Sequence, residues 1–166
     1  MDAIKAITTR HSVRLYSGKP VEKDIIQDLV LAGSLAPTAR NIQPWLFVAL
    51  TEQDLVKEIA NITDHGKFMA NAPASILVFS EDTKYYLEDG CAATENILVA
   101  ANAYGLGTCW IAGDKKPYCD QIKILLNVPE RYKLISIISL GYPKGNIKTA
   151  SKKLLDNVLC WNKYSQ

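Results

Sequence analysis

Between residues 36 and 47 the chain reads Ala-Pro-Thr-Ala-Arg-Asn-Ile-Gln-Pro-Trp-Leu-Phe. Pro37 stops the helix that precedes it, and Pro44 favours an extended backbone at Gln43. Several residues between the prolines are small or carry amides, which compete with helix and sheet for backbone hydrogen bonds. Because residues 45–50 read as a buried strand, we expect a fixed polar loop at the start of a core strand, where binding groups are often placed. A plain helix-to-strand connector is the alternative on spacing alone.

The composition sets the class of protein. A chain of 166 residues suits one domain, 1–166, with a sizeable core. Its 48% hydrophobic and 22% charged residues are typical of a soluble globular protein. The net charge of +2, without a dense Lys/Arg run, gives no support for nucleic acid or an acidic lipid surface as a partner. With no apolar signal core and no run long enough to span a bilayer, we expect a cytoplasmic protein without a membrane partner.

The cysteines and histidines do not indicate a metal site. The four cysteines, at positions 91, 109, 119 and 160, have neither C-x-x-C spacing nor the pattern of a disulfide framework. Cys91 and Cys109 lie among apolar residues, which favours a role as small core residues. His11 and His65 are the two histidines, and no H-E-x-x-H motif contains them. We therefore expect no metal.

A basic motif follows the first predicted helix, which Asp2 caps. Residues 10–14 read Arg-His-Ser-Val-Arg. Arginine forks bind phosphate bidentately, and a serine with free backbone N–H groups can complete an anion cradle. A solvated basic turn is the alternative, and charge alone does not separate the two.

Hydrophobic periodicity gives the remaining elements. It predicts helices over about 22–35, 51–62, 83–104 and 117–126, and strands over 45–50, 74–80 and 134–140. Thr51 is the predicted N-cap of its helix. The helix over 83–104 is apolar around much of its circumference, so we expect burial on several sides, partly against a partner subunit. The alternation of strands and helices by itself suggests an α/β protein.

Three further segments are candidates for binding. Residues 105–113 read Gly-Leu-Gly-Thr-Cys-Trp-Ile-Ala-Gly, and glycine lets backbone approach a flat ligand without a Cβ in the way. A strand with glycine at each end explains that run equally well. The turn at 64–68 either lines a site through Lys67 or is a plain turn. Lys152 and Lys153, in the tail, are either phosphate ligands or a surface basic pair.

Together these segments resemble the signatures of the nitroreductase family of FMN-dependent oxidoreductases. The loop resembles A-P-S-A-x-N-x-Q-P-W with Thr38 keeping the serine hydroxyl, and residues 10–14 resemble R-[RH]-S-x-[RK]. Residues 105–113 resemble G-L-G-[ST]-x-W-I-G-G, with Ala112 replacing the first of the paired glycines. Residues 126–130 and 141–143 resemble L-x-[IVL]-P-E and G-Y-P. The tail resembles R-[KR]-P-L-E-E before a final tryptophan, with lysine for the first arginine and leucine for proline at 152 and 154.

The resemblance spans residues 2–161 and implies both a fold and a site. The fold is α+β, with a central, mainly antiparallel sheet flanked by helices, in an intertwined homodimer with FMN at the interface. Arg10, Ser12 and Lys152 would hold the FMN phosphate, and Arg14 would lie against the pyrimidine end of the flavin. The loop would reach the flavin of the other subunit, and residues 111–113 would supply backbone at the ring. The predicted cofactor-binding residues are Arg10, His11, Ser12, Arg14, Pro37, Thr38, Ala39, Asn41, Lys67, Ile111, Ala112, Gly113, Lys152 and Lys153.

The implied activity is that of an NAD(P)H-dependent FMN oxidoreductase. NADH or NADPH delivers hydride to flavin N5 and leaves, and a nitroaromatic, quinone or similar electron-poor acceptor is then reduced in the same slot. No side chain is a predicted general acid. Flavin reductase, enone reductase, reductive dehalogenase or a non-catalytic flavin-binding protein are the alternatives. A deiodinase needs a lid that grips an amino acid, and the sequence has no inserted segment long enough for one.

Overall fold

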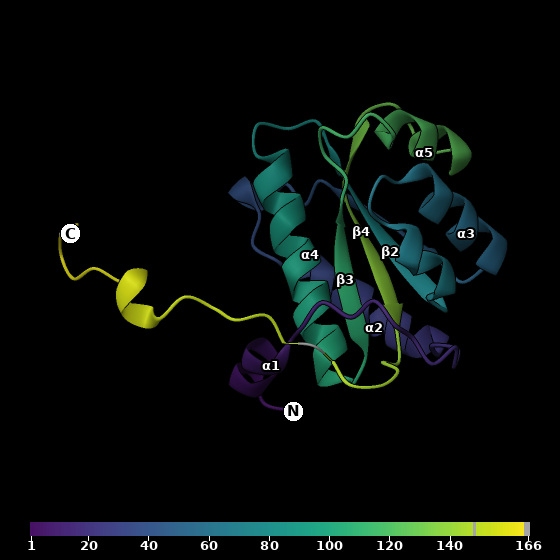
Figure 1. The fold of residues 1–166 in the computed structure, drawn as a ribbon. Coiled ribbons are helices and arrows are strands. Elements are labelled where there is room, and N and C mark those ends of the chain that lie inside the picture. The colour runs from purple at the N-terminus through teal and green to yellow at the C-terminus, as the bar shows by residue number, and fades with distance from the viewer. Residues whose placement is uncertain (148, 165–166) are drawn as a thin grey trace.

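The computed structural model describes residues 1–147 and 149–164, which form a four-stranded antiparallel sheet between two layers of helices (Figure 1). The strand order is β1-β2-β4-β3. The strands are β1 (Trp45–Leu50), β2 (Ala74–Glu81), β3 (Gly107–Ala112) and β4 (Tyr132–Gly141). The predicted α+β fold is confirmed. The alternation that suggested α/β is misleading, because neighbouring strands of this sheet pair antiparallel.

The helices cover both faces of the sheet. One layer contains α2 (Lys23–Ser34) and α4 (Tyr86–Ala103), with α1 (Ala3–Thr9) beside α4. The other contains α3 (Gln53–Ile62), α5 (Cys119–Leu125) and the 3₁₀ helix η2 (Lys67–Asn71). Side chains alternate along β2 between the two faces. Ile76 and Val78 belong to the first core, whereas Leu77 and Phe79 belong to the second, so β2 is apolar throughout its centre.

A register shift in β4 helps to fix the end of β3. Val78 of β2 pairs with Ser136 and Phe79 pairs with Leu134, which leaves Ile135 as an extra residue. The carbonyl of Ile135 accepts hydrogen bonds from the backbone N–H groups of Gly113, at 3.2 Å, and Asp114, at 3.3 Å. Such bulges re-aim the backbone next to sites. Here the bulge holds the glycine that ends the predicted flavin-facing segment.

The observed boundaries differ from the predicted ones at helix starts. The Asp2 cap is confirmed, since its side chain accepts the Lys5 N–H at 2.9 Å. The Thr51 cap is wrong: α3 begins at Gln53, and its N-cap is Glu52, without a side-chain capping bond. The long helix begins at Tyr86 instead of 83, because residues 82–85 form a bend and a turn, in which Thr83 N–H bonds back to the Glu81 carbonyl at 2.7 Å.

The described tail, residues 149–164, extends away from the body of the protein (Figure 1). It contains one short 3₁₀ helix, η3 (Leu155–Asn157). Its apolar side chains are bare: Leu154 is 74% exposed and Trp161 is 80% exposed. Among the helices formed by the described residues, none combines the length and apolar character needed to cross a membrane.

Candidate functional site

The basic motif lies in an extended segment along the edge strand β3. Val13 N–H donates to the Thr108 carbonyl at 2.8 Å, and Ser12 forms a parallel bridge with Thr108. The approach is close, because a Cβ on Gly107 would lie 2.6 Å from the Val13 Cβ. On its other side the segment pairs with the chain after β4, where Lys144 N–H donates to the Leu15 carbonyl at 3.0 Å. The motif is therefore held by backbone on two sides.

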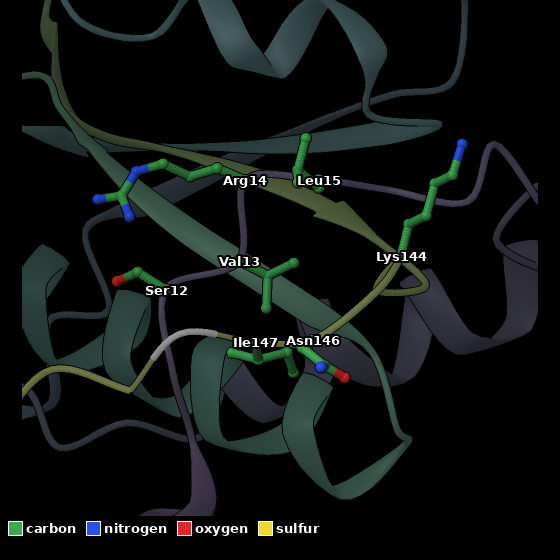
Figure 2. A pocket seen from close by; sticks show the side chains of 7 residues that line it. All are labelled: Ser12, Val13, Arg14, Leu15, Lys144, Asn146 and Ile147. Carbon is green, nitrogen blue, oxygen red and sulfur yellow. The ribbon is translucent and has the colours of Figure 1, made fainter.

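A buried tyrosine fixes the segment from inside the protein. The Tyr16 hydroxyl donates to the Val13 carbonyl at 2.7 Å and shares a hydrogen bond with the Ser139 hydroxyl, also at 2.7 Å. Burial raises the pKa of Tyr16, so its hydroxyl stays protonated. Val13 is buried, and the alternation of an extended backbone then turns Ser12 and Arg14 outward. Figure 2 shows the Ser12 hydroxyl and the Arg14 guanidinium directed to the same side, whereas Lys144 points away from them.

The outward side chains line two adjoining cavities. One, of about 170 Å³, is lined by Arg10, His11, Ser12, Arg14, Ala150 and Lys152. The other, of about 220 Å³, is lined by Ser12, Val13, Arg14, Leu15, Lys144, Asn146 and Ile147 (Figure 2). Arg10, Arg14 and Lys152 bring three positive charges to the first cavity, and its lining residues include no carboxylate. This donor set suits an anion, since arginine forks, ammonium and hydroxyl all donate hydrogen bonds.

Two of these cations have further partners. Arg10 Nε lies 3.5 Å from Glu95 Oε1 of α4, at the edge of the cavity. The Arg14 guanidinium lies 5.6 Å from the centre of the Phe68 ring of η2, within the range of a cation–π contact. Lys67 precedes that ring but is exposed and lines neither cavity. The structure therefore brings the ring of Phe68 to the basic motif, whereas the Lys67 side chain lines neither of its cavities.

The end of β3 presents backbone under tight constraint. The Ala112 carbonyl accepts the Tyr118 hydroxyl, and the Gly113 carbonyl accepts the Cys119 thiol at 2.7 Å. Burial raises the pKa of Tyr118 to about 12. A Cβ on Gly113 would lie 2.7 Å from the Ile135 carbonyl carbon and oxygen, so any larger residue at 113 requires the backbone of β4 to shift. Ala112 is exposed, whereas Ile111 is buried, so the alanine that replaces the expected glycine meets no crowding from the core.

The loop between the two prolines is held by a buried carboxylate. Thr38 Oγ1 donates to Asp89 Oδ2 at 2.9 Å, and Ala39 N–H donates to Asp89 Oδ1 at 3.1 Å. Asp89 belongs to α4 and is 5% exposed. At the far end of the loop, Glu81 N–H donates to the Pro44 carbonyl at 2.9 Å. The predicted fixed polar loop is thus observed.

The same loop stores backbone strain. Arg40, Asn41 and Gln43 have φ values of 57°, 56° and 54°. Left-handed backbone costs most L-residues roughly 1–2 kcal/mol each, and less for asparagine. The Gln43 side-chain amide donates to Asn41 Oδ1 at 3.1 Å, which adds a local bond. Strain of this kind persists only where the surroundings over-determine the conformation, and it is common at binding sites.

The predicted residues fall into three groups. Residues 10–14 and Lys152 meet at one cavity, whereas Lys153 is exposed and does not line it. Residues 37–41 form the strained loop, and they line neither of the two cavities at the basic motif. Residues 111–113 lie at the end of the strand along which the basic motif runs.

Comparisons with known proteins agree with this arrangement. The protein-family model described as "Nitroreductase family" matches residues 7–64, and the family model described as "Putative TM nitroreductase" matches residues 58–166. A relative from Archaeoglobus fulgidus, named "Putative NADH dehydrogenase/NAD(P)H nitroreductase", is 35% identical over 150 residues, covering 86% of each chain. The chain belongs to the nitroreductase family.

Two further family likenesses bear on the site. An FMN-dependent nitroreductase of solved structure from Clostridium difficile R20291 has a TM-score of 0.89 and 27% identity, covering 97% of this chain and 99% of that one. The iodotyrosine deiodinase of Nematostella vectensis is 22% identical over 193 aligned positions, covering 93% of this chain and 73% of that protein. Since this chain has 166 residues, that alignment includes segments of the deiodinase that this nitroreductase-family chain lacks.

Sequence reasoning missed three residues of this nitroreductase-family site: Asp89, Glu95 and Tyr16. The sequence does contain a signal for Asp89, because it lies four residues before Ala93 and eight before Ile97 on the buried face of α4. A carboxylate at a core position of a helix needs hydrogen-bond donors. Nothing in the sequence says that those donors come from the loop.

Proposed function

We propose that this member of the nitroreductase family is an NAD(P)H-dependent oxidoreductase that binds FMN. The observation that carries the proposal is the cavity where Arg10, Ser12, Arg14 and Lys152 converge, with three cations and a hydroxyl. A phosphate monoester fits this donor set, because it carries up to two negative charges and accepts several hydrogen bonds. The FMN dependence named for the Clostridium difficile relative supports the same cofactor.

Each residue of the basic motif then has a separate task. Arg10 and Lys152 bind the phosphate, with Ser12 donating from its hydroxyl and His11 at the rim. Arg14 lies two residues beyond Ser12 on the same side of an extended segment, roughly 6–7 Å further along. That spacing points Arg14 towards the ring system, where its charge favours the reduced cofactor. Bound FMN supplies hydride transfer between the nicotinamide and the acceptor, and the protein supplies binding, orientation and electrostatics.

The backbone of β3 offers one donor to the ring. Gly113 N–H bonds to the Ile135 carbonyl of β4, so it is directed into the sheet. Backbone groups alternate in direction along an antiparallel edge strand. Ala112 N–H therefore points away from β4, as does its carbonyl, which accepts the Tyr118 hydroxyl. This favours Ala112 over Gly113 as the backbone donor to flavin N5.

The complete site requires a second copy of the chain. One protomer leaves large apolar side chains bare on α1, α2, the strained loop and the tail. Leu35, which precedes the loop, is 73% exposed. An intertwined homodimer covers these side chains, and obligate interfaces of this kind commonly bury more than about 2,000 Å². In that dimer Pro37, Thr38, Ala39 and Asn41 contact the flavin of the partner, which accounts for their separation from the basic motif.

The test uses the purified protein. Flavin released by denaturation is identified by HPLC, and oxidation of NADH and NADPH is followed with a nitroarene, with a quinone and without acceptor. We expect FMN, and turnover that accelerates when a nitroarene or quinone is added. A dominant FAD peak, or a protein that FMN cannot reconstitute, contradicts the cofactor. Bound FMN without oxidation of either nicotinamide indicates the non-catalytic alternative.

A further inference from the structure

Asp89 is a buried carboxylate, and both of its side-chain hydrogen bonds go to the loop between the two prolines. It is 5% exposed and lies on the core face of α4 in line with Ala93 and Ile97. Burying a carboxylate is unfavourable unless hydrogen bonds compensate for the lost water. Each of its oxygens has one donor, Thr38 Oγ1 at 2.9 Å and Ala39 N–H at 3.1 Å. Both donors belong to the segment between the prolines.

The loop needs such an anchor. Three of its non-glycine residues, Arg40, Asn41 and Gln43, have positive φ, so an untethered loop has lower-energy conformations available. The Thr38 hydroxyl passes the constraint on, because it also accepts the Gln43 N–H at 3.3 Å. Asp89, Thr38 and Gln43 thus form a chain of hydrogen bonds that begins in the core and ends at the last strained residue. Removing Asp89 leaves the hydroxyl and the Ala39 N–H without their partner.

We infer that Asp89 is a positioning residue of the cofactor site. Its carboxylate keeps residues 38–43 in the strained conformation in which the loop contacts the flavin of the partner subunit. Asp89 acts through Thr38 and Ala39 and does not itself touch the cofactor. This inference rests on the proposed function. It means that Asp89, in the core of one protomer, affects the FMN affinity of the site in the partner subunit.

Two pairs of variants separate positioning from packing. Asp89→Asn keeps the shape of the side chain. It also keeps both hydrogen bonds, since its carbonyl accepts from Ala39 N–H while its amide donates to the Thr38 hydroxyl. Asp89→Leu keeps the branched shape, with larger methyl groups in place of the two oxygens, and removes both acceptors. Thr38→Ser retains the hydroxyl and Thr38→Val removes it. The conservative variant of each pair is therefore the matched control for the other.

Two measurements follow each variant. The rate of tryptic cleavage after Arg40 in the cofactor-free protein reports the loop, and quenching of flavin fluorescence gives the FMN dissociation constant. For Asp89→Leu we expect faster cleavage and an FMN dissociation constant raised about tenfold, the effect of losing one to two buried hydrogen bonds. The FMN dissociation constant of Asp89→Asn should stay within about threefold of wild type by the same conversion, and Thr38→Ser should keep the wild-type rate of cleavage. Thr38→Val should add little to Asp89→Leu, because the two side chains act as one unit.

The outcomes are distinguishable. A wild-type protein that binds no FMN refutes the proposed function, and this inference with it, before any variant is made. A wild type that binds FMN, with Asp89→Leu at the same affinity and the same cleavage rate, overturns the inference alone. Equal losses in Asp89→Asn and Asp89→Leu also overturn it, since they indicate charge or folding instead of positioning. If Asp89→Leu does not fold, Thr38→Val is compared with Thr38→Ser in the cofactor-free protein, and equal rates of cleavage after Arg40 refute the inference.

Discussion

The ion pair between Arg10 and Glu95 makes a two-sided prediction about FMN affinity. Arg10 Nε and Glu95 Oε1 lie 3.5 Å apart, with side chains 24% and 51% exposed. A pair at this exposure contributes about 0–1 kcal/mol. Glu95 also brings a negative charge to the edge of a cavity that, in the proposed function, receives a phosphate. Glu95 therefore competes with the cofactor for Arg10, and Glu95→Gln should tighten FMN binding.

The magnitudes follow from the two contacts. Glu95→Gln removes at most about 1 kcal/mol of competition, which lowers the FMN dissociation constant by up to about fivefold. Arg10→Gln loses a charge-assisted contact with the phosphate of about 1.5–3 kcal/mol. In this variant, however, FMN binding no longer has to break the ion pair with Glu95. The net loss is about 0.5–3 kcal/mol, so the dissociation constant should rise about 2–150-fold. The two variants should move the affinity in opposite directions.

Titration of the cofactor-free protein with FMN, followed by flavin fluorescence, measures both effects. The titration is repeated in about 0.5 M salt, where screening between exposed charges should shrink the gain from Glu95→Gln. Glu88→Gln is the matched control, because it removes the same charge from an exposed position on α4 outside the cavity lining. If Glu95→Gln weakens FMN as much as Arg10→Gln does, then Glu95 positions the guanidinium for the phosphate and the competition argument is wrong.

Four other perturbations test the rest of the site. Lys152→Gln should weaken FMN binding in the same titration while Lys153→Gln leaves it unchanged, and equal effects would mean a diffuse surface charge. Arg14→Gln should lower the flavin reduction potential by about 20–45 mV in a spectroelectrochemical titration, the equivalent of about 1–2 kcal/mol, and an unchanged potential contradicts its place beside the ring. Gly113→Ala should cost about 1–3 kcal/mol in urea unfolding, because its Cβ meets backbone that cannot yield; wild-type stability would show that β4 adjusts. Deleting residues 149–166 should give a flavin-free monomer in sedimentation, because the deletion removes Lys152 and the exposed apolar side chains of the tail; a flavin-loaded dimer would refute this role of the tail.

The elements that could be predicted best from the sequence are the strands that consist of a continuous apolar run, because such a run fits only a buried position. The strands at 45–50, 74–80 and 134–140 are found within two residues of their expected ends. Their antiparallel pairing came from the family resemblance, because alternation of helix and strand alone favours the wrong class. The bulge at Ile135 was not predictable: residues 134–140 read as one continuous apolar strand, and nothing in them marks an extra residue.

The candidate site also contains residues that the sequence identified and contacts that it could not predict. The basic motif and residue 152 were identified through the family resemblance, because their residue types alone left a solvated basic turn and a surface basic pair open. The structure places them at one cavity. Which lysine of the pair faces that cavity could not be predicted, because neighbouring residues in an irregular tail follow no period that assigns a side. The contacts of Asp89 and Glu95 were also out of reach, since each joins α4 to a segment more than 40 residues away in the sequence.

Helix α4 connects the two halves of the site through its polar side chains. Asn102 Nδ2 donates to the Ala6 carbonyl of α1 at 2.8 Å, and α1 leads directly into the basic motif. Asn96 Nδ2 donates to the Ala32 carbonyl of α2 at 2.9 Å, and α2 leads directly into the strained loop. With Glu95 on Arg10 and Asp89 on Thr38, the same helix contacts both motifs as well as the helices before them. Asp89 and Glu95 are six residues apart, roughly 9 Å along the axis. In the proposed dimer, a displacement of α4 would therefore act on the basic motif of its own protomer and on the loop together.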